Sequence, residues 1–188
     1  MDQHKNRRPR PSVSVHTKRR RQPKKKLTRP YTVSKQPVVT APLAGMATWV
    51  RLCCKHSDGS LWNNGIFVNR PMRDKPGIIS NHARGLATDL SYRWQPPKRG
   101  RQDGRKVSRA YMNKLLQNAD TLGIELVIDY AQSRSWRCDR GTWQIGKFSS
   151  ADWWHVEVNS RLANDPEATK QAFQAVFKPS PKAAPKTV

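Results

Sequence analysis

The feature that most constrains the fold is the uneven distribution of charge and proline along the 188 residues of the chain. The first 35 residues contain thirteen Lys or Arg and a single acid, Asp2, and six prolines lie between Pro9 and Pro42. The few apolar residues of this stretch show no helical or strand period. Such a segment cannot bury enough apolar surface to offset the entropy lost on ordering. We therefore predict a disordered basic tail over residues 1–44.

A second, shorter tail is predicted over residues 178–188, which contain three prolines and three lysines. The remaining residues, 45–177, are numerous enough to build one hydrophobic core. No stretch approaches the roughly 20 apolar residues needed to span a bilayer. The first 26 residues also lack the apolar region of a signal peptide. Three cysteines are too few for a disulfide-dense scaffold, and their odd number fits a reducing compartment: Cys53, Cys54 and Cys138.

Strand patterns with helices between them place the predicted domain in the α+β class. Strands are predicted over residues 47–55, 65–69, 86–92, 124–130 and 154–158. A helix is predicted from Ser108 to Leu122, because apolar residues recur there every three or four positions and Gly123 follows. A last helix is predicted to begin at Pro166, since proline is favoured at the first helical position. The polar stretch 94–106 predicts a loop.

Two histidines of the predicted domain lie close to carboxylates in the sequence. His82 is seven residues before Asp89, and His155 stands between Asp152 and Glu157. Each of these residues alone also fits a structural role. Together, two imidazoles and one carboxylate with an open fourth position have the usual composition of a catalytic zinc site.

The spacing of these residues follows two motifs. Residues 80–89 fit the pattern S-x-H-x-x-G-x-A-x-D at every fixed position, and residues 152–157 fit an acid, two residues and His, followed by x-Glu. In these motifs the chain resembles the zinc D-alanyl-D-alanine carboxypeptidase family, which includes D,D-dipeptidases and the L-alanyl-D-glutamate endopeptidases of phage endolysins. The similarity covers about residues 65–158. It implies a Hedgehog/DD-peptidase-like fold, with a small antiparallel sheet and flanking helices.

The resemblance also implies roles for individual residues. His82, Asp89 and His155 would hold Zn²⁺, which supplies hydroxide at neutral pH. Asp152 would act as the general base, where many members of the family carry Glu. The shorter Asp side chain implies either a closer backbone or poor activity. Glu157 would lie on the same face of a strand as His155, either supporting that ligand or forming a surface salt bridge.

Further residues would complete the site. Arg70, with Arg73 as the alternative, would stabilise the oxyanion that develops on the scissile carbonyl. Ser80 and Gly85 would shape the ligand-bearing turn, and Ser80 would also contact substrate. The tryptophans around the second motif either wall a cleft for peptide and sugar or pack in the core, and Trp153 and Trp154 are the two predicted to bind substrate. The others are Trp136 and Trp143. The basic stretch 93–106 either rims the cleft or is a solvated loop.

Two functions from different classes follow. The first is a zinc peptidase that hydrolyses peptidoglycan stem peptides; the scissile bond, D,D or L,D, and the choice between end-trimming and internal cleavage stay open. The second is a nucleic-acid or polyanion-binding protein with a degenerate hydrolase-like core, because residues 1–35 carry a charge of +12. That segment would bind teichoic acid or nucleic acid, unless it serves only as a solubilising tail. Without a signal peptide, the peptidase is expected to be made in the cytoplasm and to act at the bacterial cell wall, encoded by a phage or carried in its virion.

Overall fold

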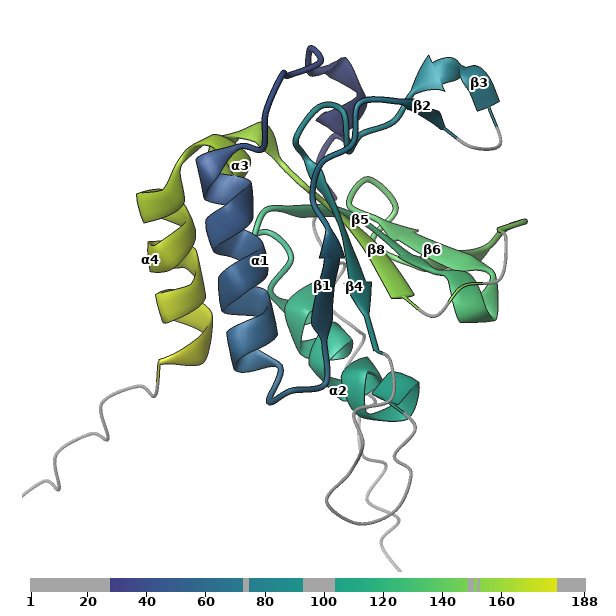
Figure 1. The fold of residues 1–188 in the computed structure, drawn as a ribbon. Coiled ribbons are helices and arrows are strands. Elements are labelled where there is room, and N and C mark those ends of the chain that lie inside the picture. The colour runs from purple at the N-terminus through teal and green to yellow at the C-terminus, as the bar shows by residue number, and fades with distance from the viewer. Residues whose placement is uncertain (1–27, 73–74, 93–103, 149–150, 152, 179–188) are drawn as a thin grey trace, which may run out of the picture.

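The computed structural model describes residues 28–72, 75–92, 104–148, 151 and 153–178. Within these residues the chain forms an α+β fold, in which helices pack against a six-stranded antiparallel sheet (Figure 1). The predicted α+β class and the antiparallel sheet with flanking helices are therefore confirmed. A separate two-stranded hairpin projects from one end of this body (Figure 1).

The sheet has the strand order β1-β4-β8-β5-β6-β7, so β8 lies between β4 and β5. The strands of the sheet are β1 (Trp62–Gly65), β4 (Ala87–Ser91), β5 (Ile124–Asp129), β6 (Arg134–Arg137), β7 (Trp143–Ile145) and β8 (Trp153–Val158). The hairpin consists of β2 (Pro71–Met72) and β3 (Lys75–Ile79). The helices are α1 (Ala44–His56), α2 (Gly104–Gln117), α3 (Ser160–Asn164), α4 (Pro166–Phe177) and two 3-10 turns, η1 (Val33–Lys35) and η2 (Tyr130–Gln132). None of the helices in the described part of the chain is long and apolar enough to cross a membrane.

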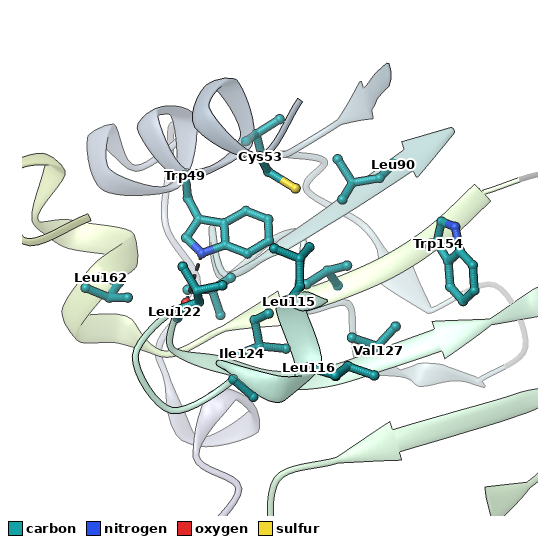
Figure 2. Packing of buried hydrophobic residues seen from close by; sticks show 14 of the residues in the cluster. Trp49, Cys53, Leu90, Leu115, Leu116, Leu122, Ile124, Val127, Trp154 and Leu162 are labelled. Carbon is teal, nitrogen blue, oxygen red and sulfur yellow. Dashed lines mark hydrogen bonds between the residues drawn. The ribbon is translucent and has the colours of Figure 1, made fainter. Parts of the chain in front are cut away.

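One face of the sheet carries the hydrophobic core. Alternate residues of β8, namely Trp154, Val156 and Val158, are buried there at 1% exposure or less. Figure 2 shows side chains from α1 and α2 meeting those of β4, β5 and β8 in this core. The indole Nε1 of Trp49 on α1 donates to the carbonyl of Leu122 at 2.9 Å, which ties α1 to the segment that precedes β5. Because the helices cover this face, the ionisable side chains of β4 and β8, namely Asp89, His155 and Glu157, are left to the opposite face.

The strand predicted over residues 47–55 is wrong, because these residues belong to helix α1. The residues that α1 buries lie one, three and four positions apart, which is the pattern of a single helical face: Gly45, Met46, Trp49, Val50 and Cys53. The β-branched and aromatic residues that suggested a strand carry only a weak, context-dependent preference. Burial of a whole helical face against the sheet outweighs that preference.

Other predicted elements lie close to their expected places. Strands β4, β5 and β8 match the predictions over 86–92, 124–130 and 154–158 to within one residue at each end. Helix α4 begins at Pro166 as predicted, and the Asp165 carboxylate caps it by accepting from the backbone N–H groups of Glu167 and Ala168, each at 2.9 Å. Helix α2 spans 104–117 instead of 108–122, and turns follow it to Gly123, whose φ is 66°.

Several expectations need correction. The strand predicted over 65–69 is wrong, because β1 ends at Gly65. The loop predicted over 94–106 lies outside the described residues up to position 103, and residues 104–106 belong to α2. Strands β2, β3, β6 and β7 and helix α3 had no clear signal in the sequence. The predicted C-terminal tail lies outside the described residues from position 179 onward.

The predicted domain boundary at residue 45 is also corrected, because residues 29–33 pack on the sheet and residues 36–43 contact the turn that precedes β4. Val33 is fully buried. The carboxylate of Glu125 on β5, a residue 1% exposed, accepts from the backbone N–H groups of Thr32 at 2.6 Å and Val33 at 3.0 Å, and pairs with Arg29 at 3.1 Å. A buried carboxylate needs such partners, so Glu125 anchors the segment. The prediction of a disordered tail is wrong for residues 28–44, and residues 1–27 lie outside the described part of the chain.

Candidate metal centre

Three potential metal ligands from distant parts of the sequence meet on the face of the sheet opposite the core. The Oδ1 atom of Asp89 lies 3.4 Å from Nε2 of His82 and 3.1 Å from Nδ1 of His155. The two imidazole rings have centroids 5.1 Å apart. One ligand atom from each residue lies within 4.8 Å of the other two. The convergence predicted for these three residues is therefore present in the structure.

Strand pairing accounts for two members of this triad. In the antiparallel pair β4–β8, Asp89 stands directly opposite His155. Because side chains alternate along a strand, both point away from the core, while their neighbours Leu90 and Trp154 point into it. The alternation of apolar and polar residues in both strands thus fixes the register that joins a carboxylate to an imidazole.

The third member, His82, comes from a tight turn over residues 81–85 that leads into β4. The hydroxyl oxygen of Ser80 accepts from the backbone N–H of His82 at 3.3 Å. Gly85 has a φ of +69°, and a Cβ at this position would lie 2.8 Å from Cγ of Leu43 and 3.1 Å from Cγ2 of Val39. Glycine is therefore required here for both conformation and space. These contacts fit the turn-shaping role predicted for Ser80 and Gly85, whereas Ser80, at 7% exposure, offers little surface to a substrate.

The triad is electrostatically coupled. Burial raises the pKa of the Asp89 carboxyl, but hydrogen bonds with His155 and His82 outweigh this effect and hold its pKa well below the usual range. Burial lowers the pKa of His155, but its hydrogen bonds with Asp89 and Glu157 outweigh burial and raise the pKa to about 9. The carboxylates thus create a strong preference for positive charge at this position, which either a proton or a metal ion can supply.

Glu157 supports His155 from the side away from Asp89. Its Oε1 atom lies 3.0 Å from Nε2 of His155, and the residue is 4% exposed. Burial raises the pKa of the Glu157 carboxyl, but hydrogen bonds from His155, Tyr31 and Asn81 outweigh burial and lower it. Of the two roles left open for Glu157, support of the ligand agrees with this geometry and a surface salt bridge does not.

The donor set suits a transition metal such as zinc. Zinc prefers imidazole nitrogen and carboxylate oxygen, whereas magnesium and calcium prefer sites made of oxygen alone. Metal-bound histidines usually give their second ring N–H to a carboxylate, which is the relation of His155 to Glu157. The Asp89 side chain is 24% exposed, against 9% for His82 and 10% for His155, so the triad is most open to solvent beside the carboxylate.

The tryptophans separate into two groups. Trp154 and Trp136 are buried in the core at 1% and 4% exposure, and the indole Nε1 of Trp154 donates to the hydroxyl of Ser108 at 3.0 Å. The structure therefore corrects the prediction that Trp154 binds substrate, because its ring lies on the opposite face of the sheet from the triad. Trp143 is partly buried and packs against the guanidinium of Arg134, 4.3 Å from its carbon to the ring centroid.

Trp153 alone of the predicted substrate-binding tryptophans stands beside the triad. It is two residues before His155 on β8, so it shares the same face of the strand. Tyr130 packs edge-on against it with centroids 5.8 Å apart, and Phe148 packs edge-on against Tyr130 at 6.1 Å. These two aromatic residues were missed by the sequence reasoning, because nothing in their immediate sequence relates them to the second motif.

Three further residues were predicted for the site, and the structure does not place any of them in contact with the triad. The guanidinium of Arg70 donates to the carbonyl of the next residue, Pro71, at 3.0 Å, and no hydrogen bond joins it to the triad in the part of the chain that is described. Arg73 and Asp152 lie outside the described residues.

Tyr31 and Asn81, which both hold Glu157, were missed by the sequence reasoning. The signal for them was indirect: a carboxylate predicted on a buried strand requires polar partners.

Comparison with known proteins gives no relative for this chain: no family model, no curated protein and no solved structure matches it. The two motifs and the geometry of the site are therefore the basis on which a function is inferred.

Proposed function

We propose that this chain is a zinc-dependent peptidase that hydrolyses peptidoglycan stem peptides, similar to the zinc D-alanyl-D-alanine carboxypeptidases and phage endolysin peptidases. The observation that carries the proposal is the meeting of His82, Asp89 and His155 around one point, with their ligand atoms within 4.8 Å of one another. These are the three positions that the family's two motifs assign to the metal. A Hedgehog/DD-peptidase-like fold is part of the proposal.

The neighbourhood of the triad supports a hydrolytic role over a purely structural metal site. Three protein donors leave a coordination position for water or substrate, whereas structural zinc sites are closed by four protein ligands. The triad is most open to solvent beside Asp89. Trp153, which packs against Tyr130, lies on the same face of the sheet. An ion held there supplies a Lewis acid and lowers the pKa of water to about 7.

Side chains of this protein would orient the metal ligand, transfer the proton, stabilise the developing charge and contact the substrate. Glu157 keeps the ring of His155 in a fixed orientation by accepting its Nε2–H. Asp152, three residues before that ligand, takes a proton from the attacking water and passes it to the leaving amine. Arg70 or Arg73 stabilises the negative charge that develops on the scissile carbonyl oxygen. Trp153 and Tyr130 give the stem peptide an apolar surface to lie against.

The experiment combines metal analysis with digestion of purified muropeptides by the full-length protein. We expect one zinc per chain and release of a D-Ala or cleavage of a stem-peptide bond, with the product masses identifying the scissile bond. His82→Asn should lose both the metal and the activity. His56→Asn is the matched control, because His56 stacks on Phe177 with centroids 4.5 Å apart and has no part in the triad; it should keep both.

A second variant separates the metal ligands from the general base. Asp152→Asn should retain zinc and lose at least about a hundredfold in turnover, the usual contribution of acid–base catalysis. A wild-type protein that binds zinc but leaves every muropeptide intact would contradict the peptidase assignment while preserving the metal site. A protein with no affinity for zinc would contradict both.

A polyanion-binding role is the second candidate, supported by the charge of +12 carried by residues 1–35. The contribution of Lys and Arg to such binding falls steeply with salt, because counterions are released from the polyanion. The test is binding of the full chain to teichoic acid and to DNA at several salt concentrations, against a variant with Lys24, Lys25 and Lys26 changed to Gln. Affinity that is independent of salt and unaffected by these substitutions would exclude the role.

A further inference from the structure

The carboxylate of Glu157 lies at the centre of a closed hydrogen-bond network beside the candidate metal centre. The phenol of Tyr31 donates to its Oε2 atom at 2.5 Å, and the amide nitrogen of Asn81 donates to its Oε1 atom at 2.7 Å. The same amide nitrogen lies 3.0 Å from the phenol oxygen of Tyr31, so the three side chains form a ring. The Oε1 atom is also the partner of Nε2 of His155 at 3.0 Å. The carboxylate is therefore held at both oxygens before any metal is considered.

This network decides which nitrogen of His155 is left for a metal. Both ring nitrogens face carboxylates, Nδ1 toward Asp89 and Nε2 toward Glu157. Nδ1 is the nitrogen on the side of the triad, because it lies 3.1 Å from Oδ1 of Asp89, whereas Nε2 lies 3.0 Å from Oε1 of Glu157. A carboxylate that is fixed in place on the Nε2 side keeps the ring proton there, which leaves the Nδ1 lone pair for the ion.

Tyr31 comes from the N-terminal segment, far from either motif in the sequence. Its backbone neighbours, Thr32 and Val33, are bound to the buried carboxylate of Glu125, and Thr32 donates to it from both its N–H and its hydroxyl. The guanidinium of Arg137 lies over the ring of Tyr31, 5.0 Å from its centroid. Tyr31 is therefore anchored through its backbone and its ring, so its phenol occupies a defined position.

We propose that Tyr31 is a positioning residue for the metal centre: together with Asn81 it holds Glu157 so that Glu157 accepts from Nε2 of His155 and Nδ1 remains available to the ion. The inference rests on the proposed function, in which His155 binds the metal. It assigns to the N-terminal segment a part in the site, although the similarity to the peptidase family covers only about residues 65–158.

The test measures zinc affinity of the full-length protein by competition with a chelator, in wild type and in Tyr31→Phe. This substitution removes one hydroxyl and keeps the aromatic ring and its contact with Arg137. Loss of a residue that orients a metal ligand typically weakens metal affinity by about 10–100-fold. We expect a loss in that range, together with faster exchange with water of the Nε2 proton of His155 in the NMR spectrum of the zinc-loaded protein.

Thr32→Val is the matched control. It removes one hydroxyl from the neighbouring residue and from a hydrogen bond to a different buried carboxylate, that of Glu125, at 2.8 Å. We expect zinc affinity and the exchange of the His155 proton to be unchanged in this variant, with thermal melting checking that both variants are folded.

The outcomes are distinguishable. A Tyr31→Phe protein that binds zinc within twofold of the wild type overturns the inference and leaves the proposed function intact. An equal loss in both variants also overturns it, because anchoring of the segment, and not the phenol, would then be responsible. Absence of zinc binding in the wild type contradicts the proposed function itself.

Discussion

At the scale of single residues, His155 is the group on which the electrostatics of the site converge. It is 8% exposed and lies within hydrogen-bonding distance of two carboxylates, Asp89 at 3.1 Å and Glu157 at 3.0 Å. Two negative charges on one imidazole favour a cation at this position. The same arrangement that would hold a metal therefore also holds a proton when no metal is bound, and the two compete for Nδ1.

This competition predicts a pH dependence of zinc binding. With a pKa of about 9, His155 is protonated at neutral pH in the metal-free protein, so zinc binding must release a proton. The apparent affinity should fall by roughly tenfold for each pH unit between 9 and 7, the mass-action slope for one displaced proton. Calorimetric titration in buffers of different ionisation enthalpy measures the number of protons released. A proton release of zero at pH 7 would contradict the prediction.

Stability of the metal-free protein should depend on pH in the opposite sense. The pKa of His155 is raised from its ordinary value of 6.5, so protonation stabilises the folded state. This contribution is fully present below about pH 6.5 and is lost as the pH rises through about 9. Chemical denaturation between pH 6 and 10 checks it, with His155→Gln as the variant that should lack this dependence.

At the scale of secondary-structure elements, local sequence determined some structures and packing determined others. Helix α4 and strand β8 were predictable, because Asp165-Pro166 is a strong helix start and WWHVEV alternates between core and site. Helix α1 was not, because Trp49 and Val50 favour strands in isolation and only their burial at helical spacing shows the true structure. Strands β6 and β7 were missed because their arginines and polar residues resemble a loop.

The contact between α1 and α3 yields a prediction that concerns packing alone. A Cβ at Gly45 would clash with the carbonyl oxygen of Leu162 and lie 2.6 Å from that of Ala163, which is backbone and cannot move aside cheaply. Gly45→Ala should therefore destabilise the fold by about 1–3 kcal/mol, the usual cost of overpacking. This loss of stability is expected although alanine has a higher helix propensity than glycine.

The measurement for Gly45→Ala is the free energy of unfolding in denaturant. Gly77→Ala in β3 is the control, since a Cβ there meets no atom within 4 Å, and it should stay within about 0.5 kcal/mol of the wild type. Equal stabilities of the two variants would show that α1 and α3 do not approach each other as closely as the structure has them.

At the scale of the whole molecule, the candidate site was predictable in its ligands but not in its surroundings. His82, Asp89 and His155 could be named from motif spacing, because two short motifs each carry their own ligands. Tyr31 could not, since charge and proline content placed it in a disordered tail. Composition averages over a segment, whereas residues 29–33 are held by specific buried partners about ninety or more residues away in the chain, such as Glu125 and Glu157.

Two truncations test whether the folded domain begins before residue 36. Removal of residues 1–27 should leave the free energy of unfolding and zinc affinity unchanged. Removal of residues 1–35 also removes Arg29, Thr32 and the fully buried Val33, which takes away the hydrogen-bond and charge partners of the Glu125 carboxylate. Breaking a buried charge pair by deleting one partner costs about 3–5 kcal/mol. Similar unfolding free energies for the two truncated proteins, measured in urea, would contradict the role given to residues 28–35.

X-ray absorption at the zinc edge, on full-length protein loaded with one equivalent of zinc, identifies the atoms that surround the ion. An ion held by His82, Asp89 and His155 should have a first shell of nitrogen and oxygen only, at about 2.0–2.2 Å, with the outer-shell scattering of two imidazole rings. His82→Asn, which should not retain the ion, should not give this signal. Sulfur scattering at about 2.3 Å, the zinc–thiolate distance, or a shell without imidazole would place the ion elsewhere and contradict a metal centre at these three residues.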